Sequence, residues 1–229
     1  IALTEAINQQ GVNILLNIFF GPAINAARGI SFQVGNALQN FSHNIYSATR
    51  PQIVKAYAVK NMDYFFSTIN SSSKFTYYLL MMLAVPLILN IDYILSIWLT
   101  IIPKYTSIFS VLIIIYSLID CLKNPLWAAA QAVGKLKMYS LMGGIVFLLN
   151  FPLAYFSLAA GLSPYSVFIT YILVRIAYIW VVLVQIQKIL PDFNLSSYFQ
   201  SVIVPVILVT LIAPIFPVAV DQYIDDLSS

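Results

Sequence analysis

The side chains of this sequence best placed to do chemistry are polar and ionisable groups that lie inside long apolar segments. The richest segment is 22–48, where such residues recur at helical spacing. At about 100° per residue they fall within an arc of roughly 120°, which predicts one polar helix face. Its members are Asn25, Arg28, Asn36, Gln39, Asn40, His43 and Ser47. Segment 1–20 carries a looser polar stripe that includes Glu5. Two neighbouring helices with polar faces predict a shared hydrophilic cavity.

Arg28 is the strongest single candidate in this cavity, because a guanidinium offers a permanent, planar set of donors that suits phosphate. We therefore expect Arg28, with Asn25, Asn36 and Gln39, to contact a substrate. Glu5 is expected either to neutralise Arg28 or to carry a proton. The alternative for the amides is structural, since amide hydrogen bonds between membrane helices contribute about 0.6 kcal/mol each.

Three further charges lie inside apolar segments. Asp120 and Lys123 are three residues apart and can pair on one helix, so they are candidates for coupling or charge pairing. The adjacent Asn124-Pro125 removes a backbone hydrogen bond and predicts a kink. Arg175 lies near the middle of segment 164–188, which has no acidic residue. Its counter-charge must come from another helix, a lipid phosphate or a substrate, and we count it among the substrate-binding candidates.

The composition identifies the environment of these groups as a membrane. Of 229 residues, 61% are hydrophobic and only 8% are charged, whereas soluble domains carry about 25% charged residues. Most of the surface must therefore face lipid, which excludes a nucleic-acid-binding partner. A disulfide scaffold is also excluded, because Cys121 is the sole cysteine of the chain.

Seven segments are long enough, at about 20 mostly apolar residues, to cross a membrane as helices. Gly21-Pro22, Gly134, Gly161 to Pro164 and Pro191-Asp192 separate several of them, and these residue types punctuate helices. The prediction is an all-α polytopic membrane helix bundle of about seven transmembrane helices. They are 1–20, 22–48, 72–91, 105–131, 136–160, 164–188 and 197–220.

The loop charges predict the orientation of this bundle. Seven Lys and Arg residues lie in one set of connections and Lys104 alone in the other, so the even-numbered spans should end in the cytoplasm. The first span then also begins there, which predicts an even number of upstream spans in a longer protein. Residues 51–71 predict an amphipathic helix at the cytoplasmic interface, with a plain solvated loop as the alternative.

Three stretches carry a resemblance to a known family. GVNILLNIFFGPAINAARGISFQV at 11–34, ATRPQIVKAYA at 48–58 and NPLWAAAQAVGKLKMY at 124–139 resemble bacterial polysaccharide-biosynthesis flippases, O-antigen flippases among them, of the multidrug/oligosaccharidyl-lipid/polysaccharide exporter superfamily. The resemblance implies that residues 1–190 form the second six-helix lobe of a two-lobe exporter. Residues 191–229 would then add one transmembrane helix and an acidic outer tail.

The resemblance further implies export of an undecaprenyl-pyrophosphate-linked oligosaccharide across the bacterial inner membrane, for lipopolysaccharide or other surface polysaccharide, by alternating access. The expected partners are this substrate, membrane lipid and a preceding lobe of the same chain. Neither an enzymatic activity nor a cofactor or metal is expected, because HExxH, Walker and cysteine-histidine motifs are absent from the sequence. The alternatives are a multidrug exporter of the same superfamily, and a membrane glycosyltransferase or polymerase of the same pathway.

Overall fold

The computed structural model describes the backbone of residues 2–215 and the side chains of 8–136 and 140–215. This part of the chain contains helices and no strand, which confirms the all-α prediction. In chain order the elements are α1 (Ala2–Phe20), α2 (Pro22–Ala58), α3 (Met62–Leu89), α4 (Ile91–Trp98), α5 (Thr106–Asp120), α6 (Lys123–Val133), α7 (Leu136–Leu148), α8 (Asn150–Ala159), α9 (Ser166–Ile189), α10 (Leu195–Tyr198), the π-helical turn η1 (Phe199–Ile203) and α11 (Val204–Ile212).

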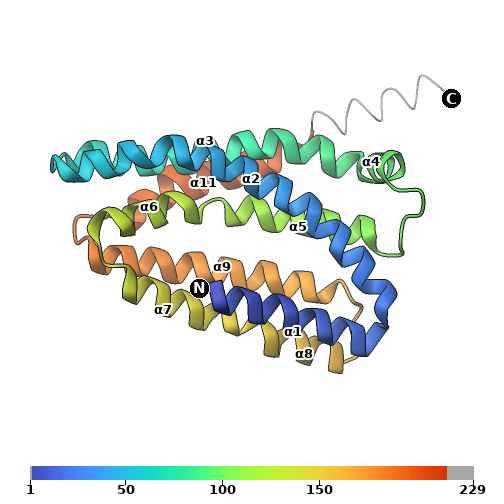
Figure 1. Cartoon of the computed structure of the whole chain (residues 1–229). Coiled ribbons are helices and arrows are strands. Elements are labelled where there is room, and N and C mark those ends of the chain that lie inside the picture. The colour runs from blue at the N-terminus through green and yellow to red at the C-terminus, as the bar shows by residue number, and fades with distance from the viewer. Residues whose placement is uncertain (1, 216–229) are drawn as a thin grey trace, which may run out of the picture.

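The long helices lie side by side in two groups that α2 connects (Figure 1). One group holds α1, α7, α8 and α9, and the other holds α3, α5 and α6. Within the described residues, five helical stretches are long and apolar enough to cross a membrane, as expected of a multi-pass membrane protein. They are 62–89, 106–133, 140–159, 166–189 and 195–212. The predicted number of seven is not confirmed, because α1 and α2, whose sequences are interrupted by polar residues, are not among the five.

Glycines separate the helices where the sequence predicts breaks. Gly21 and Gly134 have φ angles of 80° and 77°, a left-handed conformation that glycine adopts without a Cβ clash. Pro22 then occupies the first turn of α2, where its missing N–H has no intrahelical acceptor to lose. The turns after α1 and α6 are thus encoded locally.

The predicted connector at 51–71 is not a separate helix. Residues up to Ala58 continue α2, and α3 begins at Met62 after a short turn. The reason is burial: Ile53 and Ala56 extend the buried stripe of α2 beyond Pro51. The side chain of Asn61 accepts a hydrogen bond from the Tyr64 N–H at 3.1 Å and caps α3.

The last described span packs against α3 through polar contacts. Tyr198 donates to Ser73 at 3.2 Å, and the hydroxyls of Tyr77 and Thr210 lie 2.6 Å apart. Residues 195–212 thus join the same bundle, while the predicted domain boundary at 190 stays a prediction. The predicted acidic tail, with Asp221, Asp225 and Asp226, lies outside the described residues.

Two hydrophobic clusters fill the bundle, one that runs along α3 and includes α6, and one that includes α1 and α8. On α5, Tyr116 belongs to the cluster that includes α1 and α8, whereas Leu118 belongs to the cluster that includes α3 and α6. On α9, Val174 and Tyr178 divide between the two clusters in the same way. Arg175 lies between these two residues of α9, and Asp120 follows Leu118 on α5, so both buried charges lie close to the boundary between the clusters.

Candidate functional site

A three-membered ion-pair cluster lies where the two hydrophobic clusters meet. One carboxylate oxygen of Asp120, Oδ1, lies 2.9 Å from Lys123 Nζ and 3.0 Å from Arg175 Nε. The Asp120 and Arg175 side chains are only 6% and 3% exposed, whereas that of Lys123 is 26% exposed. The counter-charge of Arg175 therefore comes from another helix, α5, which is one of the three sources expected from the sequence.

The helix break predicted at Asn124-Pro125 positions two of these charges. Pro125 has no N–H, and the carbonyl of Cys121 accepts instead from the Asn124 N–H at 3.2 Å. The Leu118 carbonyl accepts from the Cys121 thiol at 3.0 Å, because the Leu122 N–H bonds to Ile119. The span 106–133 therefore divides into α5, which ends at Asp120, and α6, which begins at Lys123. The Asp120–Lys123 pair bridges the break.

The carboxylate of Asp120 stands at an unfavourable helix end. The carboxyl end of a helix carries partial negative charge, which opposes an acidic side chain there. Two cations beside one oxygen offset this opposition and the cost of burying the carboxylate. The buried carboxylate of Asp120 is therefore paired with two cations from α6 and α9.

Aromatic rings enclose the guanidinium of Arg175. Its Nη2 donates to the hydroxyl of Tyr116. The rings of Tyr116, Phe147 and Tyr178 have centroids 5.0, 5.1 and 5.0 Å from its Cζ, within the range of cation–π attraction. A Cβ at Gly143 would lie 2.6 Å from the Tyr178 ring, so this glycine makes room for the ring. Arg175 is thus held within the bundle by several protein groups at once.

A polar cavity of about 130 Å³ adjoins the ion-pair cluster. Amide side chains line it from two helices, Gln9 from α1 and Asn36 and Gln39 from α2. The full lining is Gln9, Phe32, Asn36, Gln39, Ile113, Tyr116, Asp120, Lys123, Phe147, Tyr171 and Arg175.

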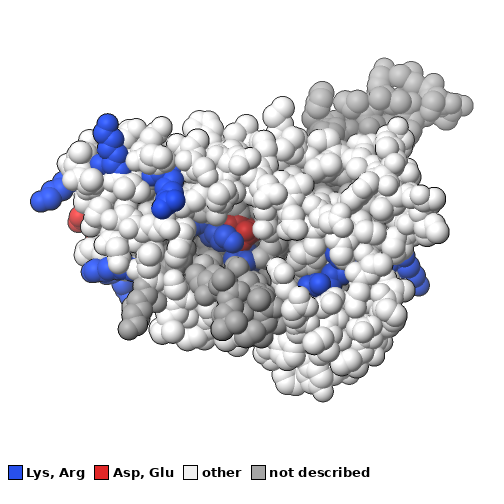
Figure 2. All heavy atoms as spheres, viewed as in Figure 1, with Lys and Arg blue, Asp and Glu red and all other residues white. Residues whose placement is uncertain are grey.

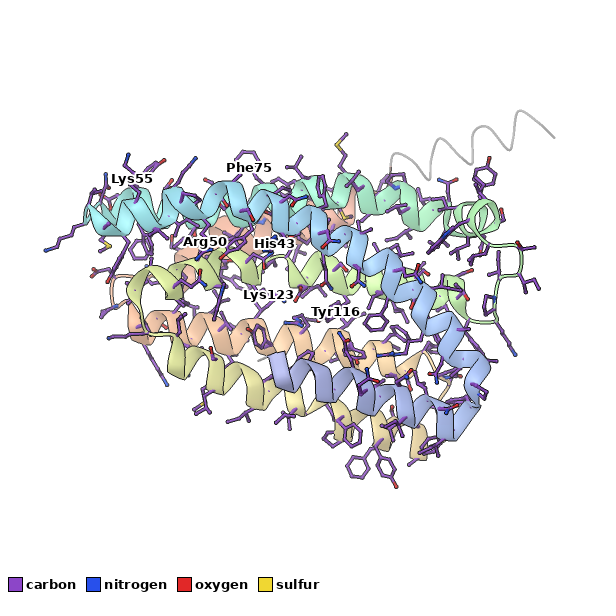
Figure 3. The ribbon with its side chains drawn as sticks, in the orientation of Figure 1. His43, Arg50, Lys55, Phe75, Tyr116 and Lys123 are labelled. Atoms are coloured by element: carbon purple, nitrogen blue, oxygen red, sulfur yellow. The ribbon has the colours of Figure 1, made fainter. Side chains whose placement is uncertain are left out.

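A second polar pocket of about 240 Å³ shares Gln39, Asp120 and Lys123 with the first and includes His43 and Asn124. Figure 2 shows a recess near the middle of this face where basic and acidic atoms adjoin, apart from the other basic groups of the face, which lie toward its two ends. In Figure 3, Lys123 lies in the central region of the bundle, near Tyr116 and below His43 of α2. Of the three charged residues of the cluster, Lys123 is the most exposed, and it lines both pockets together with Gln39 and Asp120.

The structure brings five of the predicted site residues together and separates others. Asn36, Gln39, Asp120, Lys123 and Arg175 all line the 130 Å³ cavity. The remaining candidates, Arg28, Asn25 and Glu5, are not among its described lining residues, and the side chain of Glu5 lies outside the described residues. Whether any of these residues contacts a substrate stays a prediction.

Arg28 is not itself a lining residue of this cavity, but it contacts two residues that are, Gln9 of α1 and Phe32 of α2. Its Nη2 donates to the Gln9 carbonyl at 3.1 Å and its Nη1 to Asn13 Oδ1 at 3.4 Å. Its guanidinium also lies 4.5 Å from the ring centroid of Phe32. Arg28 therefore links α2 to α1 through hydrogen bonds. From the sequence, only Glu5 was considered as a structural partner of Arg28.

The aromatic residues around Arg175 and the amide of Gln9 were not among the predicted site residues. Tyr116 had a detectable signal, because it stands four residues before Asp120 and so shares its helix face. No sequence signal distinguishes Phe147 and Tyr178, because the chain contains 15 Phe and 15 Tyr residues and most of them are equally suited to face lipid.

Comparison of the chain with protein-family models, with curated proteins and with solved structures finds no match.

Proposed function

We propose that the protein is a transporter, a flippase that exports undecaprenyl-pyrophosphate-linked oligosaccharide repeat units across the bacterial cytoplasmic membrane for surface polysaccharide assembly. The observation that carries the proposal is the polar cavity, where amide side chains and an excess of positive charge meet inside a membrane helix bundle. Such groups are costly within a membrane and are concentrated along substrate pathways.

The charges of the cavity favour an anionic substrate. Lys123 and Arg175 face a single carboxylate, that of Asp120, so the cluster has one positive charge in excess. A pyrophosphate group would neutralise this excess in a low-dielectric environment, where opposite charges attract far more strongly than in water.

The amides favour a substrate that also carries sugars. Gln9, Asn36 and Gln39 each offer both a donor and an acceptor, which matches the hydroxyl groups of an oligosaccharide. The polar face of α2 continues along Asn40 and His43, which are exposed. Alternating access would require a second lobe opposite this face to complete the pathway, as the family resemblance implies.

A multidrug or cation exporter of the same superfamily is the second candidate. It draws on a specific observation, because Phe32, Tyr116 and Tyr171 line the cavity beside Asp120, and aromatic and acidic groups suit organic cations. We rank it second because Asp120 already has two cationic partners.

Analysis of lipid-linked intermediates in a deletion strain tests the proposal. Cells without the protein should accumulate complete undecaprenyl-linked repeat units on the cytoplasmic face, and a plasmid copy should clear them. Incomplete repeat units would favour a glycosyltransferase instead, and complete but unpolymerised units outside would favour a polymerase. Normal intermediates together with lost resistance to cationic dyes would favour the multidrug exporter.

A further inference from the structure

The three charges of the cluster differ in how free they are to change partners. Arg175 is almost fully buried, is enclosed by three rings and donates to Tyr116. Lys123 has one described ionic partner, Asp120, and a quarter of its side chain is exposed where the two polar pockets meet. Lys123 can therefore leave Asp120 at little cost, whereas Arg175 cannot.

The carboxylate of Asp120 remains neutralised if Lys123 leaves. Arg175 Nε stays 3.0 Å from the same oxygen, so no buried charge is left without a partner. The released ammonium would lie beside Gln39, which lines both pockets. An ammonium with adjacent amide N–H donors is a suitable site for a phosphate oxygen.

We propose that Lys123 exchanges partners, from Asp120 to a phosphate group in the cavity, and that this exchange loosens the break between α5 and α6. The identity of the anion rests on the proposed function. The inference adds that Lys123 contacts this anion and that the break between α5 and α6 loosens as a result. The consequence follows from position, because the Asp120–Lys123 pair spans the break and is lost when the anion binds.

The reactivity of the Cys121 thiol can be used to detect this exchange. It lies inside the break between the two charges, it is buried, and its thiol donates to Leu118 O at 3.0 Å. It also borders the 240 Å³ pocket. When the break loosens, this thiol should become more accessible to a small reagent.

The experiment measures the rate at which N-ethylmaleimide labels Cys121 in the purified full-length protein, with any cysteine outside this sequence replaced by serine. Saturating inorganic pyrophosphate should raise the rate by about two- to fivefold, the change in an opening equilibrium expected from losing one ion pair of this kind. Lys123→Gln should label at the raised rate without pyrophosphate and should not respond to it. Lys135→Gln, which removes an exposed lysine from the turn between α6 and α7, should behave as the wild type.

Pyrophosphate binding, measured by calorimetry, supplies a second readout that does not depend on labelling. If Lys123→Gln binds pyrophosphate as tightly as the wild type, Lys123 is not the residue that contacts the anion. The proposal is also overturned if the wild type does not bind pyrophosphate. Binding that slows Cys121 labelling, or leaves it unchanged, would overturn the loosening of the break. If Lys123→Gln is not recovered in folded form, Lys123→Arg replaces it, and it should keep both binding and the labelling response.

The source of the anion is resolved by a parallel titration with farnesyl pyrophosphate in detergent micelles. A lower midpoint than for inorganic pyrophosphate identifies a lipid headgroup, and equal midpoints identify a free anion; both outcomes support the exchange. The result is separable from the proposed function. Suppose that Cys121 labelling responds to pyrophosphate only when Lys123 is present, but that deletion of the protein leaves lipid-linked intermediates normal. The partner exchange of Lys123 would then be supported, and the proposal that the protein is a flippase would be refuted.

Discussion

Replacing Asp120 with asparagine should destabilise the protein more than any other single change in the cluster. The substitution keeps the size of the side chain but removes the charge that neutralises Arg175, whose side chain is 3% exposed. Removing one partner of a buried ion pair typically costs about 3–5 kcal/mol, because it leaves an uncompensated buried charge. We expect the lower half of this range, about 3 kcal/mol, since the cation–π contacts of Arg175 remain and partly compensate.

The free energy of unfolding, measured by titrating the purified protein from mild detergent into sodium dodecyl sulfate, checks this value. Asp192→Asn is the matched control, because Asp192 is exposed in the turn before α10 and should change stability by less than about 0.5 kcal/mol. The double variant Asp120→Asn/Arg175→Met should regain most of the loss, since replacing both partners of a buried pair is often neutral. An Asp120→Asn protein as stable as the wild type would refute the ion-pair argument.

Two further predictions concern packing and orientation. Gly143→Ala should cost about 1–3 kcal/mol in the same titration, because its Cβ would displace the Tyr178 ring from Arg175. Gly29→Ala, in an open position on α2, should instead be neutral or stabilising by up to about 1 kcal/mol; equal losses would contradict the steric reason. Single cysteines at Lys135 and Leu162, in a cysteine-free background, should react with an impermeant thiol reagent on intact cells only at Leu162. Equal labelling would contradict the predicted orientation.

The helical class and most helix ends were predictable because they depend on local chemistry. Gly21 and Gly134 each mark a break in the sequence, and the structure has a turn at each. Asn124-Pro125 marks the break between α5 and α6, which lies just before it, between Asp120 and Lys123. The continuation of α2 to Ala58 was not predictable in the same way. It depends on the burial of Ile53 and Ala56 against neighbouring helices, and packing of this kind outweighs the helix-breaking tendency of Pro51.

The candidate site was predictable in composition but not in pairing. Helical spacing alone indicated that Asn36 and Gln39 share the polar face of α2, and both line the cavity. The contact between Asp120 and Arg175 depends on how α5 packs against α9, which spacing within one helix cannot specify. The same limit explains why the hydrogen bonds of Arg28 to Gln9 and Asn13 of α1 could not be predicted, whereas its contact with a substrate stays a prediction.

Translocation in reconstituted vesicles is the direct measurement of whether the cavity carries a lipid-linked substrate across a membrane. The full-length protein is placed in liposomes that contain an undecaprenyl-pyrophosphate-linked oligosaccharide, and a glycosidase added outside measures how much substrate reaches the outer leaflet. We expect vesicles with the wild-type protein to expose inner-leaflet substrate faster than protein-free vesicles. Lys123→Gln should slow this exposure, whereas Lys135→Gln should not. Exposure no faster than in protein-free vesicles, or a rate unaffected by Lys123→Gln, would contradict the claim that this cavity carries the anionic substrate.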